Sequence, residues 1–99
     1  MHLYMRTRNL QGELMVSICD KECLGKIYRE GKFTLKVTPQ FYGDQLVPLE
    51  KAIAELKKAT IANLVGEIII SECIKFGLVH KKGVIRINGI PHAQIITIK

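Results

Sequence analysis

The segment NGIPHAQ, residues 88–94, separates two apolar runs near the C-terminus that are each typical of a buried β-strand. Its Asn-Gly and Gly-x-Pro steps predict a tight turn, because glycine accepts positive φ and proline restricts the backbone. A strand, a turn and a second strand at this end of the chain indicate a β-sheet. The turn would also hold the imidazole of His92 in a defined place.

Four segments of the N-terminal part also predict strands, residues 3–8, 13–18, 26–29 and 33–37. They alternate apolar and polar residues or are rich in β-branched ones. Glycines separate them, so an antiparallel meander is the simplest arrangement. Between the second and third segments we expect Asp20 to cap one short helical turn.

The middle of the chain predicts two helices. Pro48 suits the first position of a helix, and the apolar residues that follow it lie on one stripe. A second apolar stripe begins at Ile61 and is rotated by about 150° from the first, at about 100° per residue. One straight helix could not face both stripes toward one core. We therefore expect a break at 58–60, with Thr60 as the cap of a second helix that ends at Gly77.

Residues 78–80, 84–87 and 93–98 predict three more strands, joined by turns at 81–83 and 88–91. A block of strands, two helices and a second block of strands favour an α+β fold. The expected architecture is a two-layer sandwich, in which a mainly antiparallel sheet carries both helices on one face.

The composition is typical of a globular protein, with 47% apolar and 24% charged residues. A chain of 99 residues can bury one core, so residues 1–99 are expected to form a single α+β domain. No apolar run approaches the roughly 20 residues that span a bilayer, and no signal-peptide pattern follows Met1. We therefore expect a cytoplasmic protein that has no membrane partner.

The three cysteines, Cys19, Cys23 and Cys73, are an odd number, which suits free thiols in a reducing compartment. Together with a histidine they could be imagined as a zinc site, but structural zinc sites usually have more tightly paired ligands. We expect core thiols, no metal and no cofactor.

The net charge of +6 and the basic pI raise the hypothesis of an RNA or ribonucleoprotein partner. Lys and Arg that neutralise phosphates release counterions and so supply affinity without sequence specificity. The charge is spread evenly, because residues 1–36 and residues 37–99 each contribute +3. A lysine-rich surface that keeps the protein soluble is the alternative interpretation.

A glycine inside the second predicted helix, Gly66, would cost about 1 kcal/mol relative to alanine, which suggests that another backbone crosses there. Asn63 and Glu67 lie on the same side of that helix. If the turn at His92 crosses at this point, the three polar side chains form one network. A carboxylate beside histidine raises the imidazole pKa and suits either acid–base chemistry or a binding anchor. The alternative is that these groups only satisfy each other in the core.

The candidate binding site collects polar and turn residues from three segments: Tyr42, Gly43, Asn63, Gly66, Glu67, Pro91, His92 and Gln94. Tyr42 could stack on a base, although an aromatic pair with Phe41 at the edge of the core is the more usual role. No catalytic residue is assigned. The sequence contains no phosphate-binding loop, nucleophile elbow, zinc hairpin or paired catalytic carboxylates.

Several short motifs in fixed order resemble a small archaeal family, domain of unknown function 424: CD at 19–20, LGK at 24–26, FYG at 41–43, NLVGE at 63–67, Gly77 and GIPHAQ at 89–94. The resemblance covers nearly the whole chain. It implies an archaeal cytoplasmic protein with a compact two-layer α/β domain, and it implies no activity. The family commonly has an apolar residue where this chain has Cys23, which weighs further against a metal pair with Cys19.

Three classes of function stay open. The leading hypothesis is a non-enzymatic module that binds RNA or a ribonucleoprotein through Lys and Arg on an open sheet face or on loops. The second is a small enzyme or ligand-binding protein with a site around His92 and Glu67. The third is a protein–protein assembly factor, which could be a homo-oligomer.

Overall fold

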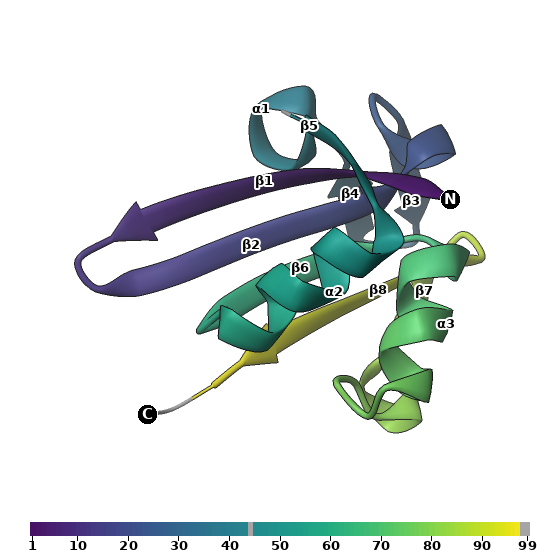
Figure 1. The fold of residues 1–99 in the computed structure, drawn as a ribbon. Helices are drawn as coiled ribbons and strands as arrows, with labels where there is room; N and C mark the ends of the chain where they lie inside the picture. The colour runs from purple at the N-terminus through teal and green to yellow at the C-terminus, as the bar shows by residue number, and fades with distance from the viewer. Residues whose placement is uncertain (44, 98–99) are drawn as a thin grey trace.

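The computed structural model describes residues 1–43 and 45–97 as a mixed α/β fold built on a six-stranded sheet (Figure 1). In chain order the elements are β1 (His2–Leu10), β2 (Glu13–Asp20), the 3-10 turn η1 (Lys21–Cys23), β3 (Ile27–Glu30), β4 (Phe33–Lys36), α1 (Pro39–Tyr42), β5 (Gln45–Pro48), α2 (Leu49–Lys58), β6 (Ile61–Val65), α3 (Glu67–Lys75), the 3-10 turn η2 (Lys81–Gly83), β7 (Ile85–Ile87) and β8 (Ile90–Ile96).

The large sheet has the strand order β5-β1-β2-β6-β8-β7, and β3 pairs with β4 in a separate hairpin. All neighbours in the large sheet are antiparallel except β2 and β6, which are parallel. The sheet is therefore mainly antiparallel, as the sequence predicts.

The main hydrophobic core lies between one face of this sheet and the helices α2 and α3, which Figure 1 shows on the same side of it. Alternate residues of a strand point to one face, so every second residue of the central strands joins this core. α2 contributes the apolar stripe that the sequence predicts, and α3 contributes Ile69 and Cys73 from the later part of the second predicted stripe, together with Ile70. The core includes Val16, Ile18, Ala52, Leu56, Leu64, Ile69, Cys73 and Ala93.

A second, smaller core lies on the opposite face, where the β3–β4 hairpin and α1 cover one end of the sheet. Cys19 and Val65 point to this face because they alternate with Ile18 and Leu64. The hairpin packs Leu35 against them. The face beyond the hairpin is not covered by any further helix or strand of the described residues.

The prediction that the second helix begins at Ile61 is wrong, since Ile61–Val65 form the strand β6 and the helix begins at Glu67. Short apolar runs fit the helical and the extended pattern equally well, and the neighbouring strands decide between them. In this position β6 pairs with both β2 and β8, so its backbone groups are satisfied by sheet partners on each side. Thr60 consequently caps no helix; its hydroxyl bonds the backbone of Leu14, at 2.9 and 3.1 Å.

Other boundaries also differ from the prediction. β8 begins at Ile90, inside the predicted turn at 88–91, and not at residue 93. Residues 78–80 are not a strand, because the N–H groups of Leu78 and Val79 bond the carbonyl of Cys73 and so close the C-terminal end of α3. Residues 81–83 form η2 rather than a hairpin turn. Pro48 ends the additional edge strand β5 and stands immediately before α2.

Asp20 was expected to cap the turn that follows it, but its carboxylate caps α3 instead. It accepts hydrogen bonds from the N–H groups of Ile68, at 2.8 Å, and Ile69, at 3.0 Å. The N–H groups at the start of a helix have no partner within the helix, and a carboxylate there also complements the helix dipole. The cap joins the end of β2 to the start of α3.

Candidate functional site

The predicted network of Asn63, Glu67 and His92 does not form. His92 pairs with Val65 in the sheet register, so its side chain lies on the hairpin side, whereas Glu67 begins α3 on the other side. The Glu67 carboxylate is paired with Arg86, at 3.1 and 3.2 Å. The prediction required Asn63 and Glu67 on one continuous helix that the turn at His92 would cross, and the strand at 61–65 removes the basis for that geometry.

Asn63 and Gln94 do meet, on adjacent strands. The amide nitrogen of Gln94 donates to Asn63 Oδ1 at 2.9 Å, and Asn63 is 7% exposed while Gln94 is exposed. The register continues this pair across the sheet to Ser17 and Arg6. These four side chains form a polar row on the hairpin side of the sheet.

His92 is half-buried, and burial lowers the pKa of its imidazole. The shift is opposite in sign to the one predicted from a carboxylate partner. Among residues 1–43 and 45–97, no hydrogen bond or ion pair joins His92 to an acidic side chain. Its neighbour Pro91 is buried and accepts a hydrogen bond from Gly66 N–H at 3.0 Å. The neutral imidazole is therefore the favoured form in the fold.

Tyr42 cannot stack on a base, because its side chain is 3% exposed and belongs to the second core. It packs edge to face against Phe41, with ring centroids 4.9 Å apart. Burial raises the pKa of its hydroxyl. Gly43 lies beside Leu24, where an added Cβ would come within 2.9 Å of the leucine side chain. Both residues are explained by packing.

The three cysteines are buried free thiols. Burial raises the pKa of Cys19 and of Cys73 to about 12, and it raises the pKa of Cys23 as well. A protonated, inaccessible thiol is neither a nucleophile nor a metal ligand. Within the described part of the chain, no three His, Cys, Asp or Glu side chains are placed to hold a metal ion.

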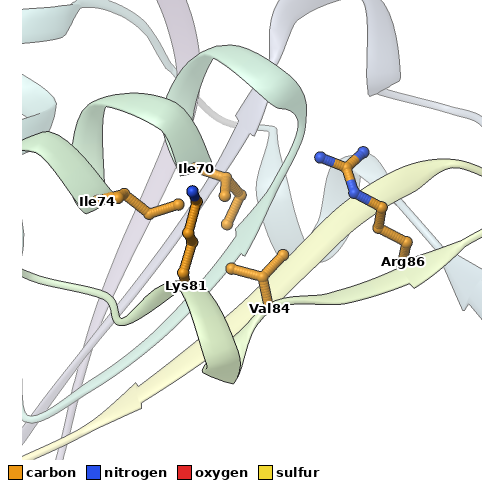
Figure 2. Close-up of a pocket in the computed structure, with 5 residues that line it drawn as sticks. All are labelled: Ile70, Ile74, Lys81, Val84 and Arg86. Carbon is orange, nitrogen blue, oxygen red and sulfur yellow. The ribbon is translucent and has the colours of Figure 1, made fainter.

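A hollow of about 270 Å³ lies between α3 and β7. Figure 2 shows Ile70 and Ile74 on the helix, Val84 opposite them, and the cations Lys81 and Arg86. Such a lining suits a ligand with an apolar body, which would contact the isoleucines and the valine, and an acidic end, which would contact the cations. It is smaller than most ligand pockets, which measure about 300–1,000 Å³, and Glu67 already neutralises Arg86.

A larger hollow of about 420 Å³ is lined by Asp20, Lys21, Glu22 and Ile68. Asp20 is the buried polar group in it, and both carboxylate oxygens are engaged in capping α3. Burial raises the pKa of Asp20, while the two helix N–H groups oppose that shift. The buried carboxylate in this hollow is therefore explained by its structural role as a helix cap.

The strands of the β3–β4 hairpin were predicted, but the cluster of cations on it was missed. Residues 26–36 are hereafter the basic hairpin. It contains four basic residues and one acidic residue, a net charge of +3. The four cations are Lys26, Arg29, Lys32 and Lys36. None of them takes part in the ion pairs found among the described residues.

An aromatic ring accompanies these cations. Phe33 is 63% exposed at the tip of the basic hairpin. The hairpin is held in place by Tyr28 and Leu35 in the second core, and by a 2.6 Å hydrogen bond from the N–H of Asn88 to Glu30. The sequence itself contains this signal, since four basic residues and one phenylalanine occur within the eleven residues 26–36.

No helix in the described ranges is long and apolar enough to cross a membrane.

The fold has a counterpart among solved structures. The crystal structure of an uncharacterized conserved protein from Methanopyrus kandleri is similar over 100% of this chain and 96% of its own, with a TM-score of 0.81 and 19% sequence identity. At that identity the similarity shows a shared fold. No curated protein shows significant similarity in sequence.

A family model described as "Protein of unknown function (DUF424)" matches residues 8–98. The match confirms the resemblance carried by the NLVGE and GIPHAQ motifs. The protein therefore belongs to the DUF424 family.

Proposed function

We propose that this protein is a non-enzymatic module that binds single-stranded RNA through the basic hairpin. The observation that carries the proposal is a hairpin that exposes the ring of Phe33 and bears four cations, none of which is in an ion pair among the described residues. Lys and Arg neutralise backbone phosphates, and an exposed ring stacks on a base, which contributes about 1–3 kcal/mol per base.

Rigidity of the hairpin supports the same proposal. Leu35 is buried in the second core and Glu30 is bonded to the turn at Asn88, so the hairpin backbone is fixed before a ligand arrives. Preorganised cations and rings lose less conformational entropy on binding than flexible ones. Stacking and phosphate contacts tolerate any base, so we expect little sequence preference.

The ligand-binding or enzymatic alternative around His92 and Glu67 has weaker support. Glu67 pairs with Arg86, and His92 lies on the opposite face. A cytoplasmic location in an archaeal cell, as the family resemblance implies, is part of the proposal. The three free thiols support a reducing compartment.

Fluorescence anisotropy with a labelled oligouridylate at several salt concentrations tests the proposal. The hairpin variant is Lys32→Gln/Lys36→Gln, and the matched control is Lys51→Gln/Lys57→Gln on α2, which removes the same charge elsewhere from exposed lysines that are likewise in no ion pair among the described residues. Each lost phosphate contact lowers the salt slope for a single strand by about 0.7, so we expect a loss of about 1.4 in the hairpin variant.

Phe33→Ala should weaken binding at every salt concentration without changing the slope, because stacking releases no counterions. Equal losses in the hairpin variant and the α2 control would show that only the net charge matters. No binding at low salt would exclude the proposal.

A further inference from the structure

Strand β8 has a free edge. It runs from Ile90 to Ile96, but its neighbour β7 pairs only with Ile90, Pro91 and His92. Figure 1 shows β8 continuing past β7 toward the C-terminus. In the described part of the chain no other strand pairs with β8 on that side.

The hydrogen bonds on the β6 side of β8 show which backbone groups point to the free edge. The N–H of Thr97 bonds the carbonyl of Thr60 at 2.8 Å, and the carbonyl of Pro91 accepts from Gly66 at 3.0 Å. In an antiparallel ladder, alternate residues bond to opposite neighbours. The odd-numbered residues of β8 therefore bond to β6, and the N–H and C=O groups of Gln94 and Ile96 point outward.

The free edge carries no formal charge. Residues 88–97 contain no Lys, Arg, Asp or Glu. Ile96 is 69% exposed, and Ile85 on the adjacent strand is 57% exposed on the same face of the sheet. Natural edge strands are usually protected by charges, by proline or by short length. The opposite edge strand, β5, has such protection, since it is short and ends at Pro48.

We propose that the free edge of β8 pairs with β8 of a second copy of this chain, antiparallel and about a two-fold axis through Ile95. This register places Gln94 opposite Ile96 of the other copy, and both residues direct their free backbone groups toward the partner. A two-fold contact brings the same uncharged segment against itself, so two molecules of net charge +6 meet where neither carries a charge. The two sheets become one continuous sheet.

A contact along so short an edge buries little area, so the dimer should dissociate on dilution. We expect analytical ultracentrifugation to show a shift from monomer to twice the monomer mass between low micromolar and submillimolar protein. Amide exchange followed by NMR gives a residue-level readout. The N–H groups of Gln94 and Ile96 should become protected as concentration rises, while exposed loop amides do not change.

Ile96→Pro is the decisive variant. It removes one outward N–H and leaves the hydrogen bonds to β6 intact, because proline is tolerated where the N–H of an edge strand faces solvent. We expect it to remain monomeric at the highest concentration. Ile96→Thr retains the N–H and most β-propensity, so it should still dimerise.

Ile96→Lys serves as a second variant if the proline protein fails to fold, and it should also stay monomeric through charge repulsion. A wild-type protein that is monomeric throughout would overturn the proposal. A dimer that survives Ile96→Pro, or that is lost equally in Ile96→Thr, would also overturn it, because the contact would then not be the strand pair. Phe33→Ala should dimerise like wild type, which separates this result from RNA binding.

Discussion

The side chain of Asp20 fills the space that a side chain at Gly66 would occupy. A Cβ on Gly66 would lie 2.6 Å from Asp20 Cβ and would overlap the carboxylate, and the φ of Gly66 is +121°. The same carboxylate caps α3 through Ile68 and Ile69. Glycine is needed here because β2 must deliver its last side chain to the first turn of the helix. The expected crossing of another backbone at Gly66 is thus wrong, and a capping side chain lies there instead.

Gly66→Ala should destabilise the fold by about 2 kcal/mol or more, through overlap with Asp20 and an unfavourable φ. The control is Gly77→Ala, which has a φ of +74° and open space within 4 Å. That variant should lose only about 1–2 kcal/mol, the cost of the left-handed backbone alone. Urea denaturation of both proteins measures the difference. Equal losses would show that Asp20 does not restrict residue 66.

Asp20→Asn should lower the free energy of unfolding by about 1–3 kcal/mol, because the amide nitrogen cannot accept from a helix N–H and leaves that group buried without a partner. The exposed neighbour Glu22 provides the control Glu22→Gln, which should be close to neutral. Thermal and chemical denaturation check both variants. An Asp20→Asn protein as stable as wild type would contradict the capping role.

His92 predicts a pH dependence of stability. Burial lowers the pKa of His92 in the fold, so the unfolded chain binds the proton more tightly. The contribution of neutral His92 to the free energy of unfolding is complete above the unfolded pKa of about 6.5. It is lost as the pH falls from there toward the lower pKa of the folded state. Unfolding in urea at a series of pH values should show this fall, and His92→Gln should reduce its slope. If the free energy of unfolding has the same pH slope in His92→Gln as in wild type, burial of His92 does not cause the pH dependence.

The cysteines should be unreactive in the native protein. All three are buried, and the pKa of Cys19 and of Cys73 is raised to about 12 by burial. A thiol-specific reagent such as dithiobis-nitrobenzoate should label them only at the rate of unfolding, and denaturant should release all three at once. Rapid labelling of any thiol in the folded protein would show that the second or main core opens locally.

Some of the fold follows from local pattern. The strands at 3–8 and 13–18 were predictable because alternation of apolar and polar residues has the strand period. β1 begins one residue earlier and ends two later than predicted, and β2 begins as predicted and ends two residues later. The break at 58–60 was predicted correctly from the change of apolar stripe, although the segment after it is a strand and not a second helix. The structure ends α2 at Lys58.

The candidate site was only partly predictable. Asn63 and Gln94 do lie together, at 2.9 Å, but as neighbours on paired strands and not through a helix crossing. The predicted contact between Glu67 and His92 does not form because residues 61–65 are a strand. His92 therefore lies on the hairpin side of the sheet, and Glu67 lies on the helix side. Gln94 and His92 lie beside Asn63 and Val65 on paired strands, and a helix at residues 61–65 could not form this pairing.

The sequence by itself determined the alternation of β1 and β2, the apolar stripe of α2, the net charge of +6 and the three cysteines. Tertiary structure alone decided that residues 61–65 are a strand, because so short a segment has no clear preference until β2 and β8 satisfy its backbone. It also decided that Asp20 caps a helix beginning more than forty residues later. Such pairings depend on which distant groups the fold brings into reach, and local pattern contains no information about them.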